Sequence, residues 1–268
     1  MKKILASDMD GTFLKSDHTF DKESFRVFLD SCKEKNILFV AASGRPLLSL
    51  EKLFAGFEED MAFVAENGSI ISYQGQIIFE DQPIPQETYL DIVRGIEEGP
   101  YGSQGLTVLS GRKGAYMLKE SHPEYFKLIS QFYINTQRVA SFDEVTEPIV
   151  KMVAAFPDED MAQAQAWLNQ TFPEVVAVTT GGDSVDIILS GIHKAVGLQK
   201  LCDYLGTTAK QVVAFGDNQN DLEMLDFAGL AIATENAKEE VKLRADCIIG
   251  HCDDGAVLTF MKEYVNEY

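Results

Sequence analysis

The chain has 268 residues, 46% of them hydrophobic, which suffices for one large or two modest domains with a sizeable core. Its 23 Lys and Arg against 42 Asp and Glu give a formal net charge of −19, which disfavours nucleic acids and anionic membrane surfaces as partners. The same charge repels phosphorylated ligands, so any phosphate site must be locally positive. The cysteines are scattered and no apolar run reaches the length of a membrane span, which predicts a cytoplasmic protein without a disulfide scaffold.

The first strand pattern, at residues 3–7, is followed at once by two carboxylates and a glycine, Asp8, Asp10 and Gly11. We expect no secretory leader, because this strand begins within the first few residues. Side chains at positions i and i+2 of a strand point to the same side, so Asp8 and Asp10 are expected to converge. Two close carboxylates need a cation, a shared proton or hydrogen-bond donors, and Mg²⁺ prefers such oxygen ligands. A solvated Asp-Gly turn is the plainer interpretation of this segment alone.

Helix and strand patterns then alternate up to a change at residues 83–85, Pro-Ile-Pro, where we place a domain boundary. Asp21 is expected to cap a helix whose apolar residues recur at helical spacing from Phe25 to Cys32. The next predicted elements are a strand over 37–42 that is covered on both faces, a helix start at Pro46, a strand over 61–65 and a hairpin over 69–79.

Residues 83–187 carry a different pattern, which predicts an α+β insertion with its own sheet. Its predicted elements are a helix around 89–96, strands over 106–110 and 115–119, a helix over 122–132, a strand over 149–155, a helix over 160–170, and strands over 175–179 and 185–189. Alternation then returns with a helix from 194, a strand over 211–216, short strands over 230–233 and 247–249 around a helix over 237–245, and a last helix over 255–264. The predicted fold class is α/β, a doubly wound parallel sheet built from residues 1–82 and 188–268 and interrupted by the insertion.

Polar residues gather where strands of the predicted sheet end, which is where ligands of open parallel sheets bind. They are Asp8 and Asp10 after the first strand, Ser43, Gly44 and Arg45 after the second, Lys194 at the start of the helix that follows the insertion, and Asp217, Asn220 and Asp221 after the strand over 211–216. Each segment alone has an ordinary explanation as a loop, a solvated lysine or a helix cap. Their combination in this order is far more specific.

These segments resemble the motifs of the haloacid dehalogenase (HAD) superfamily, in particular its Cof-type phosphatases with a C2 cap, subfamily IIB. The resemblance spans the whole chain and rests on Asp8-Met9-Asp10-Gly11-Thr12, Ser43-Gly44-Arg45-Pro46, Lys194 and the segment 216–221. Asn67-Gly68 and the segment 254–257 are also similar to that subgroup. The chain departs from the family at Met9, where Leu is usual, and at Ala195, where Gly usually follows the lysine. The resemblance implies a Rossmann-like core with residues 83–187 as a cap that selects the substrate.

The resemblance also implies the activity, a Mg²⁺-dependent phosphoric monoester hydrolase that works through an aspartyl-phosphate. Asp8 would be the nucleophile, and Asp10 the general acid and then the general base. Ser43 and Lys194 would complete the catalytic set. The implied substrate contacts are Thr12, Gly44, Arg45 and Asn220, and the implied metal ligands are Asp8, Asp10 through its backbone carbonyl, Asp217 and Asp221. The metal and Lys194 would supply the positive charge that the composition demands.

Other functions stay as alternatives to hydrolysis. A phosphomutase shares the Asp8 chemistry but returns the phosphoryl group to a sugar. A dehalogenase needs no Mg²⁺ and lacks the acid that Asp10 supplies. A response-regulator receiver also uses a strand-end Asp, but it is shorter, has no cap and carries its acceptor on an internal strand. We expect small phosphorylated metabolites such as sugar phosphates as substrates, with no nucleic-acid, membrane or protein partner.

A few residues have two interpretations from sequence. Arg45 could clamp the substrate or pair with a nearby carboxylate. Asn67 is expected to hold its turn rather than to touch substrate. His251-Cys252, with Cys247 nearby, could be a metal cluster, but the spacing fits no common zinc pattern, so reduced thiols are expected.

Overall fold

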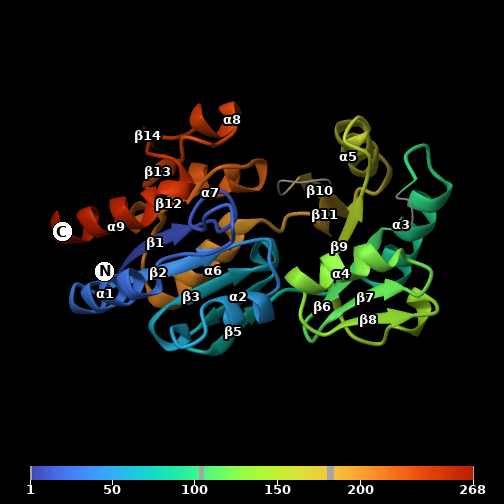
Figure 1. The fold of residues 1–268 in the computed structure, drawn as a ribbon, viewed down its shortest axis with the longest axis horizontal. Coiled ribbons are helices and arrows are strands. Elements are labelled where there is room, and N and C mark those ends of the chain that lie inside the picture. Colours follow the sequence, from blue (N-terminus) through green and yellow to red (C-terminus); the bar gives the residue numbers. More distant parts are fainter. Residues whose placement is uncertain (1, 103–105, 180–183, 268) are drawn as a thin grey trace. The chain divides into compact units, whose positions relative to one another are not determined.

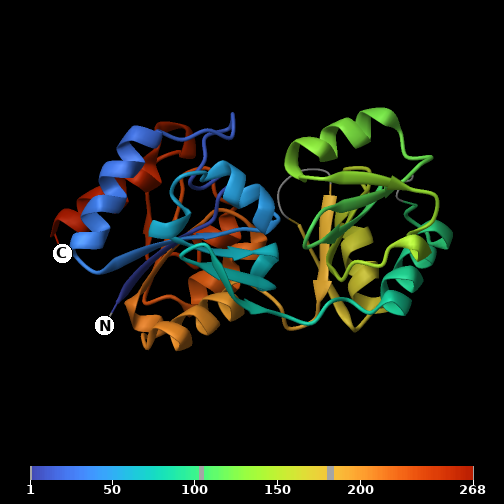
Figure 2. The ribbon, with the colours of Figure 1, turned by 90° about the horizontal axis from the view of Figure 1, so that it is seen from below.

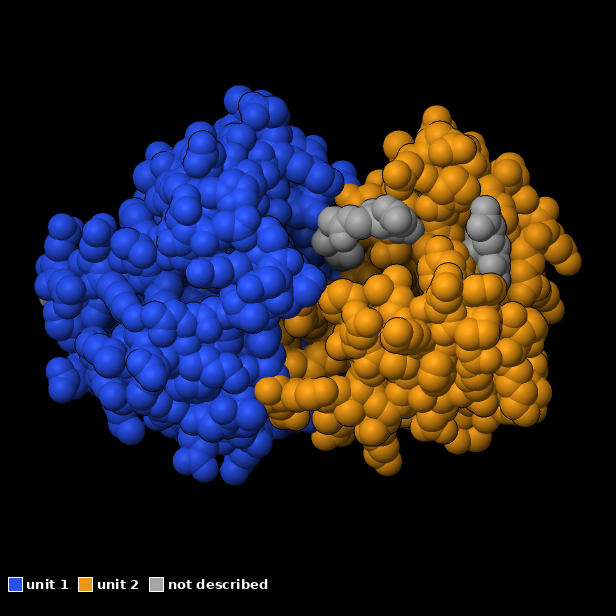
Figure 3. Space-filling view, in the orientation of Figure 1, with its two compact units in different colours: residues 1–43, 53–80, 193–268 blue, residues 44–52, 81–192 orange. Residues whose placement is uncertain are grey.

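The computed structural model describes residues 2–102, 106–179 and 184–267. The chain forms two compact units, one of residues 1–43, 53–80 and 193–268 and the other of residues 44–52 and 81–192 (Figure 3). The second unit therefore holds the predicted insertion together with a short segment from near the N-terminus. Within the described residues, no helix combines the length and the hydropathy that crossing a bilayer requires.

The sheet of the first unit runs in the order β14-β13-β12-β1-β2-β3-β4-β5 (Figure 1). Its strands are β1 (Lys3–Ser7), β2 (Ile37–Ala42), β3 (Ala62–Ala65), β4 (Ile70–Tyr73), β5 (Gln76–Glu80), β12 (Val212–Gly216), β13 (Leu230–Ala233) and β14 (Cys247–Ile248). Neighbours from β14 to β3 are parallel, and β4 and β5 continue the sheet as an antiparallel hairpin. This confirms the predicted α/β class, and strands from both ends of the chain lie in the sheet.

Helices cover both faces of this sheet (Figure 2). They are α1 (Lys22–Glu34), α6 (Lys194–Leu205), α7 (Leu222–Phe227), α8 (Glu239–Lys242) and α9 (Ala256–Glu267). On one face, Leu198 of α6 and Met224 of α7 are buried against β-strand residues such as Val40. On the other, Phe25 of α1 packs edge-on against Phe39, with ring centroids 5.1 Å apart. Alternate side chains of the strands feed these two cores, which makes the sheet doubly wound.

Helix α1 illustrates how the local sequence fixes these elements. The Asp21 carboxylate accepts a hydrogen bond from the Ser24 backbone N–H at 2.9 Å, as a helix cap does. The apolar face from Phe25 to Cys32 is buried at helical spacing. The predicted helix N-cap at Asp21 and the predicted buried face of α1 are both confirmed.

The second unit has its own sheet, in the order β10-β11-β9-β6-β7-β8. Its strands are β6 (Thr107–Gly111), β7 (Ala115–Leu118), β8 (Thr136–Val139), β9 (Ile149–Ala155), β10 (Val175–Thr179) and β11 (Ser184–Leu189). Its helices are α2 (Leu47–Leu53, whose last residue belongs to the first unit), α3 (Gln86–Glu98), α4 (Pro123–Phe132) and α5 (Met161–Thr171). Helices α3 and α5 contribute Ile92 and Leu168 to one core, and Tyr133 after α4 lies in another. The unit thus has an α+β architecture with its own sheet, and the predicted domain bounds 83–187 stay a prediction.

Candidate active site

The predicted site lies at the carboxyl ends of the central strands of the first unit. Strand β1 pairs with β2 on one side and with β12 on the other, and the chain order runs outward from it in both directions. A doubly wound sheet binds its ligand at this switch point, because the loops on either side diverge there. The loops after β1 and β12 carry most of the predicted catalytic and metal residues.

Lys194 joins the two loops through a buried ion-pair network. It is the first residue of α6 and is 0% exposed. Its Nζ donates to Asp8 Oδ1 at 2.5 Å and to Asp221 Oδ1 at 2.6 Å. Burial alone would lower the pKa of Lys194, but the Asp221 and Asp8 carboxylates outweigh burial and raise it above its ordinary value. The lysine is therefore a permanent positive charge at the centre of the site.

The carboxylates around this lysine outnumber it. Asp8, Asp217 and Asp221 each have an oxygen within 4.8 Å of the others. Burial raises the pKa of Asp8 well above its ordinary value, and the nearby Asp221 and Asp217 charges add to the increase while Lys194 opposes it. Burial, followed by the Asp221 charge, raises the pKa of Asp217 to about 7. A further cation would ionise both groups, and an all-oxygen donor set suits a hard divalent ion.

Asp221 braces the loop that carries Asp217. Its Oδ2 accepts hydrogen bonds from the backbone N–H groups of Asp217 at 2.9 Å and Asn218 at 3.1 Å, while its Oδ1 faces Lys194. It is 0% exposed and forms a reciprocal capping box with Asn218 in the turn Gln219–Asp221. These contacts give Asp221 a structural role in the site, and its predicted part as a metal ligand stays a prediction.

Gly11 brings the loop after β1 into direct contact with Asp217. Its φ is +82°, and a Cβ at this position would lie 2.5 Å from Asp217 Oδ2. The neighbouring Thr12 donates its hydroxyl to Asp217 Oδ1 at 2.6 Å. The glycine of the motif is thus required both for its backbone angle and for the space that the carboxylate occupies.

Gly11→Ala is expected to lower kcat/KM by about a hundredfold, because the methyl group must displace Asp217 from the acid cluster. Gly56→Ala is the matched control, since Gly56 has a φ of +89° and a Cβ added there would meet nothing within 4 Å. The control should lose about 1 kcal/mol of unfolding free energy from its backbone angle and keep its kcat/KM. Steady-state kinetics and urea unfolding of both variants check this, and equal kcat/KM values would contradict it.

Asp10 has a neighbour that the sequence did not reveal. His18 Nδ1 lies 2.9 Å from Asp10 Oδ1, and both side chains are partly exposed. His18 adopts a φ of 61°, which turns the loop back toward Asp10. The predicted convergence of Asp8 and Asp10 relied on strand alternation, but β1 ends at Ser7, so that geometry does not extend to Asp10. The charge of Asp10 still helps to raise the pKa of Asp8, although it contributes less than burial and less than the charges of Asp221 and Asp217.

Asn236 is a second residue that sequence reasoning missed. Its Nδ2 donates to the Gly11 carbonyl at 2.7 Å, and its Oδ1 accepts from the Cys252 backbone N–H at 3.0 Å. It thereby fixes the turn after β1 to the C-terminal part of the chain. No motif marks this residue, because its partner lies 225 positions away in the sequence.

The remaining predicted residues are divided between the units. Ser43 and Asn220, which are 2% and 9% exposed, belong to the first unit with the acid cluster. Gly44 and Arg45 belong to the second, where the Gly44 carbonyl accepts a hydrogen bond from the Lys151 ammonium and the Arg45 guanidinium lies 5.8 Å from the Phe132 ring centroid. The predicted substrate contacts of Gly44 and Arg45 stay predictions.

Comparison with known proteins identifies the family. A family model described as haloacid dehalogenase-like hydrolase matches residues 5–261. The chain belongs to this family. It is 33% identical to the 5-amino-6-(5-phospho-D-ribitylamino)uracil phosphatase YbjI of Escherichia coli, over 89% of this chain and 87% of that protein. It is 28% identical to the phosphatase YitU of Bacillus subtilis, which has the same substrate in its name, over 97% of both chains.

A solved structure matches nearly the whole chain. The crystal structure of SMU.1108c from Streptococcus mutans matches with a TM-score of 0.93 and 32% identity, over 99% of this chain and 100% of that one. The resemblance to Cof-type HAD phosphatases is therefore confirmed, and the protein is a phosphoric monoester hydrolase of this family.

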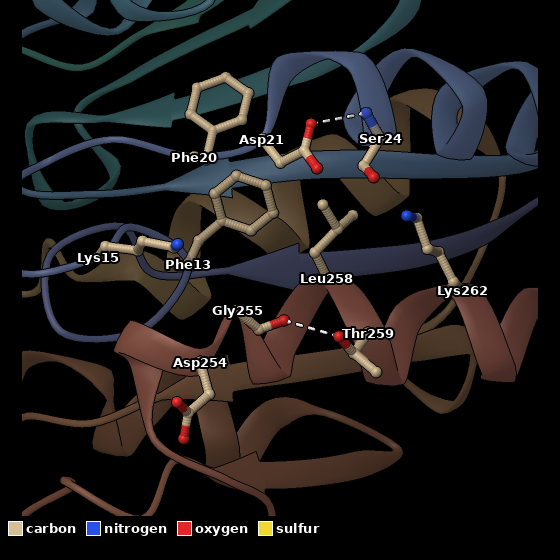
Figure 4. Close-up of a pocket in the computed structure, with 10 residues that line it drawn as sticks. All are labelled: Phe13, Lys15, Phe20, Asp21, Ser24, Asp254, Gly255, Leu258, Thr259 and Lys262. Carbon is tan, nitrogen blue, oxygen red and sulfur yellow. Dashed lines mark hydrogen bonds between the residues drawn. The ribbon is translucent and has the colours of Figure 1, made fainter.

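Two other features of this HAD phosphatase lie outside the acid cluster. His251, Cys252 and Asp253 could hold a metal ion by proximity, but His251 Nδ1 accepts from the Asp253 N–H, and Asp253 accepts from Ser16. A cavity of about 180 Å³ lies between the loop after β1 and α9 (Figure 4). It is lined by Phe13, Lys15, Phe20, Asp21, Ser24, Asp254, Gly255, Leu258, Thr259 and Lys262. Asp8, Asp217 and Asp221 are not among its lining residues, so this cavity is separate from the acid cluster.

Proposed function

We propose that this phosphatase hydrolyses a small phosphomonoester through a covalent phosphoryl intermediate on Asp8, assisted by Mg²⁺. The observation that supports this most is the buried set of Asp8, Lys194, Asp217 and Asp221 at the switch point of the sheet. A structural ion pair would need one acid for one lysine. Three acids around one buried lysine suit a site that receives additional positive charge together with an anionic substrate.

The donor set is suited to a divalent ion. Asp8 and Asp217 would bind it through their carboxylates and Asp10 through its backbone carbonyl, with Asp221 nearby. When bound, Mg²⁺ would neutralise the carboxylates and the phosphoryl oxygens, which allows both to occupy one site. The fit follows from the excess of buried carboxylate oxygens over ammonium groups in this cluster.

The residues then divide the chemistry between them. An Asp8 oxygen would form a bond to phosphorus as the bond to the leaving alcohol breaks, and Asp10 would give that alcohol its proton. Asp10 would next accept a proton from the water that attacks phosphorus and releases Asp8. Lys194 would hold the Asp8 carboxylate and the charge of the phosphoryl group. Ser43, Thr12, Gly44, Arg45 and Asn220 would contact the phosphoryl oxygens or the substrate.

We propose 5-amino-6-(5-phospho-D-ribitylamino)uracil as the first substrate to test. YbjI and YitU, which both carry this substrate in their names, align with this chain over most of its length. A small phosphorylated metabolite also agrees with a chain whose net charge of −19 would repel phosphorylated macromolecules. We assign the choice of substrate to the second unit, as the predicted cap.

Phosphate release tests this function. The protein should hydrolyse p-nitrophenyl phosphate with Mg²⁺, lose nearly all activity in EDTA, and recover it when Mg²⁺ is added in excess. The uracil substrate should then be compared with a panel of sugar phosphates by measuring inorganic phosphate, and we expect the highest kcat/KM for the uracil compound. Activity that survives EDTA would contradict the metal assignment. A hexose phosphate converted to its isomer without phosphate release would indicate a mutase instead.

A further inference from the structure

The Asn67 loop, defined as the turn Glu66–Gly68 after β3, has an unusual backbone. Its residues have φ values of 49°, 54° and 109° in succession. Glycine adopts such angles readily, but Glu66 and Asn67 do so at a cost. Both are 1% exposed. A buried loop keeps this conformation only where its surroundings enforce it, and such positions cluster at functional sites.

Asn67 connects two loops that carry predicted substrate contacts. Its backbone N–H donates to the Ser43 carbonyl at 3.0 Å. Its Oδ1 accepts from Asn220 Nδ2 at 3.1 Å, within the buried part of the unit. In the sheet, the strand before Asn220 is β12 and the strand before Asn67 is β3, with β1 and β2 between them. The hydrogen bond therefore joins two loops at the carboxyl edge of the sheet whose strands are separated by β1 and β2.

Gly68 packs the same loop against the start of α6. A Cβ on Gly68 would lie 2.4 Å from the His193 carbonyl oxygen, and a Cβ on Gly197 would lie 3.0 Å from Gly68 Cα. The loop therefore lies against His193, the residue that precedes α6, and Lys194 is the first residue of that helix. A single loop thus contacts the segments that carry Ser43, Lys194 and Asn220.

We infer that Asn67 is a positioning residue for phosphoryl transfer. Its side-chain oxygen fixes the direction of the Asn220 amide, and its backbone N–H fixes the chain at Ser43. Without the side chain, the Asn220 amide loses a buried partner and is free to rotate away from the phosphoryl position. The inference rests on the proposed function for its kinetic readout, but it assigns a residue that the proposed chemistry does not use.

The test compares Asn67→Gly, Asn220→Ala and the double variant. Glycine tolerates the φ of 54°, so Asn67→Gly removes the side chain without adding backbone strain. We expect kcat to fall about tenfold to a hundredfold with less than about a threefold change in KM. The double variant should be no slower than Asn220→Ala alone, because both changes remove one interaction. Asn67→Asp, which keeps the acceptor, should recover part of the loss in kcat.

Asn36→Gly is the matched control, because Asn36 is exposed, has a φ of 55° and precedes β2 at the opposite end of the strand from Ser43. It should keep wild-type kcat. A kcat for Asn67→Gly within twofold of wild type, or losses that multiply in the double variant, would overturn the inference. If Asn67→Gly does not fold, Asn220→Ala carries the test, since it removes the same hydrogen bond from the other side, and a kcat within twofold of wild type for that variant would overturn the inference. A wild-type protein without Mg²⁺-dependent phosphatase activity would instead refute the proposed function.

Discussion

Asp8→Asn is expected to lower kcat for phosphate release by at least about a thousandfold, because the amide cannot form the phosphoryl bond. The protein should remain folded. Folding raises the pKa of Asp8, so at neutral pH its ionised form costs stability when no metal is bound, and the neutral amide removes that cost. In EDTA, the variant should therefore unfold at a urea concentration equal to or above that of the wild type.

Asp17→Asn provides the control for Asp8→Asn. Asp17 also lies in the loop after β1. It is exposed to solvent, and its carboxylate accepts a hydrogen bond from the Thr19 hydroxyl. Its variant should retain wild-type kcat, which would show that loss of an acid from this loop is harmless outside the cluster. An Asp8→Asn enzyme with more than about a tenth of wild-type kcat would exclude Asp8 as the nucleophile.

Lys194→Met is expected to reduce both stability and activity. Methionine has a similar length, but it leaves the buried Asp8 and Asp221 carboxylates without their shared cation. Breaking a buried pair in this way typically costs about 3–5 kcal/mol, and we expect that loss of unfolding free energy in EDTA at pH 7. With Mg²⁺ present, kcat should fall by at least about a hundredfold, because a fixed charge next to the phosphoryl group is lost.

Lys200→Met separates this effect from a general loss of charge on α6. Lys200 is exposed on the same helix, and its ammonium lies 5.1 Å from the Phe79 ring centroid. Its variant should change the unfolding free energy by less than about 1 kcal/mol and leave kcat unchanged. Urea unfolding followed by circular dichroism measures the stability of both variants, and phosphate release measures their kcat. If the two variants lose the same stability, the buried network contributes nothing that is specific to Lys194.

The elements of the core were predictable because their signals are local. The apolar run at 37–42, the cap at Asp21 and the turn at Gln74-Gly75 each depend on neighbouring residues, and each is present in the structure. Two short elements were not predicted, because their local sequences give no clear signal. Strand β8 has a half-polar sequence, Thr-Gln-Arg-Val, and α7 is only six residues long, so neither gives a clear period.

The site was predictable only in part. Asp8, Lys194, Asp217 and Asp221 stand at element ends, where topology brings them together, and the structure places all four in one cluster. His18, Asn236 and the contacts of Asn67 depend on how loops fold over one another. Tertiary packing determines the partners of these residues, and the periodicity of a single sequence does not reveal such loop–loop contacts.

The position of β1 between β2 and β12 has a consequence for folding during synthesis on the ribosome. The hydrogen bond between Lys194 and Asp8 closes a span of 186 residues, so a ribosome-bound chain that ends before this lysine has the Asp8 carboxylate without its ammonium partner. Such long-range closure slows folding. The ion pair between Asp8 and Lys194 can therefore form only after residue 194 has been synthesised.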